Sequence, residues 1–350
     1  MTKRSWSGLV ISCVLMMSWA AAAAMDMSPV RFDTAYTPLF GGDNLVRSPD
    51  GRTVLKLDRF TGSGFVSKSA YHHGFFSASI KLPRDYTAGV VVAFYGLGVK
   101  LVGSEILSER GFEIWMAMTK AKGNLSNGDV FPGKHDELDF ELLGNRRGHA
   151  WHVQTNMYGN GSTGRGREER YLLPFDPTAA PHSYAIAWTP AAVIFYVDGI
   201  PIRELVRCSG ADYPAKPMSV YATIWDGSAW ATDGGRYKVD YAYAPFTAVF
   251  SNLVVTGASS TDDIYCGLEC AAAAVGLMTS EVAVMTPAKR GAMRQFRSRH
   301  LTYSACHDRV RYNGGVVFPE CDDSDRDNFH AWGESKRVIT YAAAGGVRVD

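Results

Sequence analysis

The sequence predicts an all-β fold, a sandwich or barrel of short strands, for residues 50–255, and three observations support this fold class. Short runs that are apolar, or that alternate between apolar and polar residues, follow one another closely. Gly, Pro and Asp residues, which favour turns, separate these runs. No part of the region repeats apolar residues at the period of a long helix. Many short strands divided by turns are typical of β-sandwiches and barrels.

The expected strands can be placed in chain order. They cover residues 74–82, 88–95, 149–158, 183–189, 193–205 and 218–225. Residues 88–95 form a continuous apolar run, which is consistent with a buried strand. The segment 193–205 contains Asp198-Gly199, a dipeptide that favours the two-residue turn of a β-hairpin.

One further strand has an unusual acidic face. Its sequence is HDELDFELLGN, residues 135–145, and it places acids at Glu137, Asp139 and Glu141, with His135 beside them. Because alternate residues of a strand share a face, the three carboxyl groups point to one side. The opposite face carries Leu138, Phe140 and Leu142. Neighbouring carboxylates repel, which raises the pKa of at least one of them, so we expect this face to look outward into a groove.

Three interpretations of the acidic face stay open on the residues alone. A solvated strand face is disfavoured because acids are poor strand formers. A calcium site lacks the usual loop and the additional oxygen ligands. The third is a pair of glycosidase carboxyl groups, which retaining enzymes hold about 5–5.5 Å apart. In an ideal strand the Cα atoms of Glu137 and Glu141 lie about 13 Å apart, so their separation does not decide between retention and inversion. Asp139 between them can hold a proton and split their pKa values.

The last hundred residues follow another pattern. Thr286 and Pro287 are typical of the start of a helix, and we expect a short helix over residues 286–301. Ala292, Met293 and Phe296 would share its apolar face. Cys306 and Cys321 flank an Asn-Gly-Gly turn at 313–315, which predicts a disulfide-closed hairpin. We therefore expect residues 256–350 to form a C-terminal extension on the sandwich.

The N-terminus is typical of a signal peptide, residues 1–24. A basic pair, Lys3 and Arg4, precedes an apolar run that is short for a membrane span. Five alanines at 20–24 offer a cleavage site, and a retained anchor is the alternative. No other long apolar stretch occurs, so the expected mature protein is soluble, extracellular and not held in a membrane.

The net charge bears on possible partners, and the cysteine usage agrees with export. The net charge of +1 gives no electrostatic case for a nucleic-acid partner. Cysteines concentrate toward the C-terminus, which suits disulfides in a secreted chain. Metal binding by Cys266 and Cys270 is weakly supported because no second Cys or His pair has zinc-site spacing, so we expect no metal. Glycosylation sequons occur at Asn124 and Asn160.

The segment HDELDFELLGN closely resembles the signature of plant xyloglucan endotransglucosylase/hydrolases in glycoside hydrolase family 16. Other stretches that resemble this family are residues 62–95, 154–171, 175–178, 196–204, 218–235 and 293–312. The resemblance covers about 50–335 with one gap and is closest to the third subgroup, which contains both hydrolases and transferases. It implies a concanavalin-A-like β-jelly-roll sandwich in which the acidic strand crosses the concave face. The catalytic domain would span residues 25–255.

The resemblance also implies roles for individual residues. Glu137 would be the nucleophile, Glu141 the acid/base, and Asp139 an assisting group that orients the nucleophile. The reaction would be a double displacement with retention. The implied substrate-binding residues are Gln154, Asn156, Arg167, Glu168, Trp225, Asp226, Trp230, Gly234 and Gly235. Tryptophan suits sugars because its face buries the C–H side of a pyranose ring.

Several positions depart from the family pattern. Asn145 does not begin a sequon just after the signature, and Asn160 would replace that glycosylation site. Pro174 stands where relatives have Trp. A Cys306–Cys321 bridge is expected, a Cys266–Cys270 bridge only weakly, and Cys208 has no family counterpart. Residues 96–124 form an atypical insertion, for which a surface loop and a retained intron translated in frame both stay open.

We therefore expect a secreted enzyme of the cell wall, or apoplast, that cuts xyloglucan and joins the new end to another xyloglucan chain or to water. We expect it to be a monomer without a cofactor. One alternative is a lectin-like polysaccharide-binding sandwich that the insertion has inactivated. Another is a β-glucanase with a different linkage preference, which would be expected to lack the extension. The sequence sets neither the ratio of transfer to hydrolysis nor the exact donor and acceptor glycans.

Overall fold

The computed structural model describes residues 25–97, 135–162, 164–260, 268–312, 318–337, 339–342 and 346–349. The first half of the described chain contains α1 (Phe32–Ala35), β1 (Tyr36–Phe40), η1 (Gly42–Asn44), β2 (Leu45–Arg47), β3 (Thr53–Leu57), β4 (Ser63–Lys81), β5 (Val90–Leu97), β6 (Glu137–Leu143), β7 (His152–Tyr158), β8 (Glu169–Leu172) and β9 (His182–Trp188). The second half contains β10 (Ala192–Val197), β11 (Ile200–Val206), β12 (Met218–Asp226), η3 (Tyr241–Tyr243), β13 (Phe246–Ser260), α3 (Leu268–Thr279), α4 (Pro287–His300), β14 (Leu301–Asp308), η4 (Asp323–Asn328), β15 (Trp332–Glu334), β16 (Ile339–Ala342) and β17 (Gly346–Val349).

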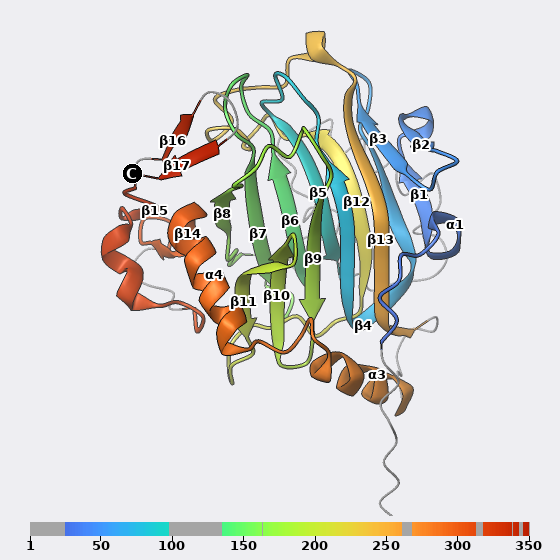
Figure 1. The fold of residues 1–350 in the computed structure, drawn as a ribbon, viewed down its shortest axis with the longest axis vertical. Coiled ribbons are helices and arrows are strands. Elements are labelled where there is room, and N and C mark those ends of the chain that lie inside the picture. The colour runs from blue at the N-terminus through green and yellow to red at the C-terminus, as the bar shows by residue number, and fades with distance from the viewer. Residues whose placement is uncertain are drawn as a thin grey trace, which may run out of the picture.

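The strands form a two-layered antiparallel sandwich, which confirms the predicted fold class (Figure 1). The strand order is β11-β10-β9-β4-β12-β5-β6-β7-β8-β14-β15. The 19-residue β4 belongs to both layers. Its first half pairs with β1 and β12, and its second half pairs with β9 and β13. The acidic strand β6 lies in the layer that contains β12, β5, β7 and β8.

Alternation along β6 fills the core between the layers. Leu138, Phe140 and Leu142 belong to the main apolar cluster. The Phe140 ring lies edge-on to Phe195 of β10 at 5.2 Å and to Tyr184 of β9 at 5.7 Å. Burial of such aromatic and aliphatic side chains is the main favourable contribution to folding. The face of β6 that carries the acids therefore points away from the core.

The predicted β10–β11 hairpin is confirmed. Its turn residues, Asp198 and Gly199, have φ values of 48° and 74°. Positive φ at both central residues is the requirement of a type I′ turn, and it explains the Asp-Gly dipeptide. The other predicted strands are also present, most of them within a few residues at their ends. The strand predicted at 74–82 is the exception, because it is only the second half of β4, which begins at Ser63. β5 continues through Gly96 and Leu97, so these two residues, placed in the insertion by the sequence, pair with β6 instead.

The elements of the C-terminal extension pack at different places on the sandwich, with α3 against β13 and β4, and α4 against β11. The predicted helix is α4, in which the side chain of Thr286 accepts a hydrogen bond from the Lys289 N–H at its first turn. The expected apolar face is corrected at one position, because Ala292 is exposed while Phe296 and His300 are buried. The chain then adds β14 to the sheet beside β8. The Cys306–Cys321 disulfide is confirmed, and it links Cys306 in β14 to Cys321 in the long connection between β14 and β15.

Several predictions lie outside the described residues. These are the signal peptide 1–24, residues 98–124 of the insertion with the sequon at Asn124, Cys266 of the weak Cys266–Cys270 pair, and the turn at 313–315. Cys208 has a free thiol. Across the described ranges, no helix combines the length and the apolar character that a membrane crossing requires.

Candidate active site

The acidic strand β6 lies between β5 and β7, with its three acids on one face. Each acid has a cross-strand neighbour on both sides. Glu137 lies opposite Leu97 and Tyr158, Asp139 opposite Tyr95 and Asn156, and Glu141 opposite Ala93 and Gln154. Residues that pair across strands point to the same side of the sheet, so the flanking strands supply one amide side chain to Asp139 and one to Glu141.

The hydrogen bonds of the three acids differ. The ring nitrogen His135 Nε2 lies 3.1 Å from Glu137 Oε2. The Gln154 side-chain Nε2 donates to Glu141 Oε2 at 2.5 Å. Asp139 Oδ1 is buried and has no hydrogen-bond partner among the described residues. Each acid therefore occupies its own polar environment, as is usual where carboxyl groups on one face have different roles.

Burial and mutual repulsion raise the pKa values of two of the acids. Burial, followed by the charge of Glu137, raises the pKa of Glu141 to about 8, and the hydrogen bond from Gln154 opposes this rise. Burial raises the pKa of Asp139 well above its usual range, and the charges of Glu141 and Glu137 add to the effect. Both shifts have the direction that was expected from repulsion on this face, with burial as the larger cause.

The acids are less accessible than the expected open groove implies. Glu137 is 6% exposed and Asp139 is 4% exposed, while Glu141 is half-buried. The acids lie on the sheet face opposite the core, so the predicted direction of the side chains is correct. Within the described ranges, no three His, Cys, Asp or Glu side chains are close enough together to hold a metal ion.

The start of β6 is fixed by a buried acid that the sequence did not single out. Asp136 accepts hydrogen bonds from the backbone N–H groups of Gly161, Ala215 and Lys216 at 2.8–3.0 Å. Because two separate loops donate to one carboxylate, Asp136 holds them against the first residue of β6. Asp136 is not one of the three alternating acids, and its hydrogen bonds to these loops give it a structural role.

The predicted sugar-binding tryptophans lie on the same face as the acids. Trp225 and Trp230 pack with Val91 of β5 and Leu143 of β6, next along the strands from Glu141. Their rings are 6.1 Å apart at 45°, and both indole N–H groups lack hydrogen-bond partners among the described residues. An unpartnered buried N–H is costly, so each is a ready donor for a ligand oxygen.

The other predicted sugar-binding residues near the tryptophans lie in or next to turns. The Asp226 carboxylate accepts hydrogen bonds from the Tyr241 hydroxyl at 2.7 Å and from the Ser228 N–H at 2.8 Å. Gly234 and Gly235 both have positive φ. A Cβ on Gly235 would lie 2.3 Å from the Ala229 carbonyl oxygen, so the turn requires glycine there.

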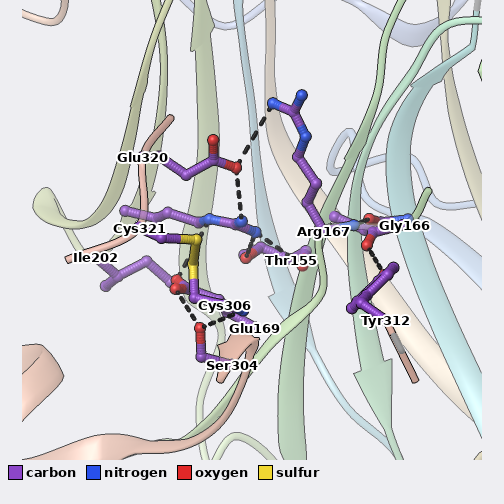
Figure 2. Close-up of polar contacts among 12 residues, drawn as sticks. Thr155, Gly166, Arg167, Glu169, Ile202, Ser304, Cys306, Tyr312, Glu320 and Cys321 are labelled. Atoms are coloured by element: carbon purple, nitrogen blue, oxygen red, sulfur yellow. Dashed lines mark hydrogen bonds and ion pairs between the residues drawn. A yellow bond between two sulfur atoms is a disulfide. The ribbon is translucent and has the colours of Figure 1, made fainter. Parts of the chain in front are cut away.

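Arg167 and Glu168 are held by the C-terminal extension. Arg167 Nη1 lies 3.5 Å from Glu320 Oε1, and Figure 2 shows Glu320 beside the Cys306–Cys321 bridge. Glu168 accepts two hydrogen bonds from Arg311, at 2.5 and 2.9 Å. The backbone N–H of Arg167 donates to Asn156 Oδ1 at 2.8 Å, so Arg167 still orients one predicted sugar-binding amide.

The sequence reasoning missed Arg170, which lies on the catalytic face. Its Nε donates to Gln154 Oε1 at 2.8 Å. Cross-strand pairing would have found it, because Arg170 of β8 lies directly opposite Gln154 of β7, which was itself predicted to be part of the site. Tyr95 and Tyr221 were also missed, and their rings stack at 5.1 Å beside Asp139. Asn160 of the sequon is exposed, and its side-chain amide donates to Asp212 at 3.2 Å.

Comparisons with known proteins identify the family of this chain. The chain matches the family described as "Glycosyl hydrolases family 16" at residues 32–109 and 110–243, and "Xyloglucan endo-transglycosylase (XET) C-terminus" at residues 274–321. It is 45% identical to "Probable xyloglucan endotransglucosylase/hydrolase protein 30" of Arabidopsis thaliana, over 96% of this chain and 90% of that protein. It is 48% identical to protein 27 of the same series, over 90% and 86% of the two chains.

Among solved structures, a β-glucanase of Bacillus licheniformis is similar, with a TM-score of 0.46 and 20% identity over 67% of this chain and 97% of that one. The sequence matches span both the sandwich and the extension. The chain therefore belongs to glycosyl hydrolase family 16 and, within it, to the xyloglucan endotransglucosylase/hydrolases.

Proposed function

We propose that this chain cleaves the β-1,4-glucan backbone of xyloglucan and transfers the new end to a second xyloglucan chain or to water, with retention of configuration. Glu137 is the nucleophile, Glu141 is the acid/base, and Asp139 assists. The observation that carries this proposal is the state of Glu141. It is half-buried on the same face as Glu137, with its pKa raised to about 8, so at neutral pH it holds the proton that a leaving group needs.

The reaction has two steps. A carboxylate oxygen of Glu137 bonds to the anomeric carbon as the glycosidic C–O bond breaks, and Glu141 gives its proton to the departing oxygen. A hydroxyl group of an acceptor sugar, or water, then gives its proton to Glu141 and bonds to the anomeric carbon, which releases Glu137. The raised pKa of Asp139 favours its neutral form, which places less negative charge between the two glutamates.

Donor and acceptor chains bind along the same sheet face. Trp225 and Trp230 offer aromatic surface and free indole N–H groups to one part of the polysaccharide. Asn156 of β7 lies directly opposite Asp139, where it reaches hydroxyl groups of the sugar that reacts. The neighbouring Gln154 is bound to Glu141 and Arg170 instead. The protein acts outside the cell, in the wall, if residues 1–24 are removed as a signal peptide. We infer that it works as a monomer.

Product analysis tests the proposal. The protein is incubated with xyloglucan, with and without labelled acceptor oligosaccharides, and the anomeric configuration of the products is followed by NMR. We expect labelled polymer and retained configuration. Glu137→Ala should abolish transfer and still bind the polymer. Transfer that persists in Glu137→Ala, or inverted products, would show that the assignment of the nucleophile is wrong.

A non-catalytic, lectin-like function is the second candidate. The low exposure of Glu137 and Asp139 favours it, because a nucleophile must reach the anomeric carbon. The same incubation separates the two functions. A wild-type protein that binds xyloglucan in a pull-down with polymer, yet shows neither transfer nor hydrolysis, supports the binding function.

A further inference from the structure

A line of polar contacts runs across the sheet from the C-terminal extension to Glu141. The Arg170 guanidinium on β8 lies over the ring of Tyr303 on β14, with its central carbon 4.9 Å from the ring centroid. Arg170 Nε donates to Gln154 Oε1 at 2.8 Å, and Gln154 Nε2 donates to Glu141 Oε2 at 2.5 Å. Each residue belongs to the strand next to that of its partner, so the line crosses β14, β8, β7 and β6 in order.

The two partners of the Gln154 amide, Arg170 and Glu141, allow only one orientation of that amide. A guanidinium group donates hydrogen bonds and never accepts them, whereas an ionised carboxylate only accepts. The amide oxygen must therefore face Arg170, which leaves the amide N–H for Glu141. Without Arg170 the amide could turn and offer its oxygen to a protonated Glu141. The cation thus selects the orientation that stabilises the ionised form of the carboxyl group.

We propose that Arg170 is a positioning residue for Glu141: it holds the Gln154 amide with its N–H toward the carboxyl group, and Tyr303 holds Arg170 in place. This inference rests on the proposed function, which makes Glu141 the acid/base. It gives the C-terminal extension a part in the chemistry, through the Tyr303 ring. Tyr303 is buried and is itself fixed by a hydrogen bond from its hydroxyl to Asp308 at 2.9 Å.

The other ionisable groups around Glu141 determine the direction of the expected effect. They are Glu137 and Asp139 on β6, Tyr95 on β5, His152 on β7, Glu168 just before β8, and Arg170 on β8. His152 is neutral at working pH because burial lowers its pKa to about 4. Among these groups only Arg170 then carries a positive charge. The charge of Arg170 and the hydrogen bond from Gln154 both oppose the rise in the pKa of Glu141, so loss of Arg170 should raise it further.

The first test is the pH dependence of kcat/KM for the Arg170→Met variant. We expect its alkaline limb, which reports the acid/base of the free enzyme, to move up by about one pH unit relative to wild type. We expect KM for xyloglucan to stay within about twofold, because Arg170 acts through Gln154 and not on the sugar. Arg170→Lys, which keeps the charge, should return part of the shift. Arg52→Met removes an exposed arginine paired with Asp50 and should leave the limb unchanged.

A second pair of variants tests the contribution of the extension. Tyr303→Phe keeps the ring beneath Arg170 and should keep the wild-type alkaline limb. Tyr303→Leu removes the ring and should shift the limb in the same direction as Arg170→Met. Circular dichroism and thermal unfolding of every variant show which are folded. If Arg170→Met does not fold, Arg170→Lys and the two Tyr303 variants decide the question.

The outcomes separate this inference from the proposed function. Wild-type turnover in Glu141→Gln would overturn the proposed function itself. An inactive Glu141→Gln together with an unshifted alkaline limb in folded Arg170→Met would overturn the positioning role alone. A raised KM with an unshifted limb would make Arg170 a substrate contact, which also overturns the inference.

Discussion

The protonation of Glu141 links catalysis to stability at the level of a single residue. Burial, and next the charge of Glu137, raise its pKa from 4.5 to about 8 in the folded protein. Between these two pH values the folded protein holds a proton that the unfolded chain has released. Stability must therefore fall as pH rises through this window.

We expect Glu141→Gln to be more stable than wild type at high pH, because the amide never ionises. The free energy of unfolding should be higher by about 2–4 kcal/mol at pH 8 and nearly equal to that of wild type at pH 4. Urea unfolding at the two pH values measures the difference. Glu281→Gln, an exposed residue, is the matched control and should change neither value. A gain of equal size at both pH values would contradict the linkage.

The same residue sets the pH range of the wild-type enzyme. Glu141 must hold a proton to assist the leaving group, so kcat/KM should fall as pH rises past about 8. A pH series of initial transfer rates, at xyloglucan concentrations well below KM, measures this limb. A limb near pH 4.5, the value of an ordinary exposed glutamate, would show that Glu141 is not buried in the working enzyme.

At the level of elements, buried ion pairs hold α4 against the sandwich. Arg297 of α4 donates to both carboxylate oxygens of Glu169 on β8, at 2.6 and 2.8 Å. Arg203 of β11 reaches the same carboxylate at 3.3 Å and also donates to Thr155 of β7. Burial opposes ionisation of Glu169, yet the charges of Arg297 and Arg203 outweigh it and lower its pKa to about 2. The helix therefore neutralises an acid that the sheet buries.

We expect Arg297→Met to cost about 3–5 kcal/mol of stability, since it removes the main partner of a buried charge. Arg290→Met, in the same helix, breaks a more exposed pair with Glu204 and should cost no more than about 1 kcal/mol. Chemical denaturation of both variants gives the two values.

The double variant Glu169→Gln with Arg297→Met should regain part of the loss, because the buried carboxylate charge is then gone and Arg203 still donates to Thr155. Equal costs for the two single arginine variants would show that the Glu169 pair does not hold the helix.

At the scale of the whole molecule, local patterns predicted the strands and the faces of β6. Alternation of Glu137, Asp139 and Glu141 with apolar residues is a property of one strand, so it can be identified without knowing the fold. Asp198-Gly199 and Thr286-Pro287 likewise encode their turn and helix start locally.

Contacts between distant segments could not be predicted in this way. Arg167 and Glu168 were both predicted to bind the substrate, yet their side chains bind Glu320 and Arg311 of the extension. The orientation of Gln154 depends on Arg170 and, through it, on Tyr303, more than a hundred residues later. Ala292 fits the apolar pattern of its helix, but it is exposed, and α4 buries His300 together with the predicted Phe296. Each of these features depends on how the extension packs on the finished sheet.

The extension completes the sheet, so the sandwich should not fold without it. Leu301, Tyr303 and Ser304 of β14 pair with β8, which would otherwise be an open edge. A chain that ends at residue 260 would also leave the buried Glu169 without Arg297, at the cost argued for that pair. We expect this truncated chain to aggregate, because unpaired edge strands associate and its charges stay buried.

Size-exclusion chromatography and calorimetry check this prediction. The full-length protein should unfold in a single transition, and a chain that ends at residue 337 is the matched control. That control lacks only β16 and β17, which pair with each other in a separate two-stranded sheet, so it should unfold as the full chain does. A monomeric, cooperatively folded chain of residues 25–260 would show instead that the sandwich is an independent domain, and that the extension serves only the site.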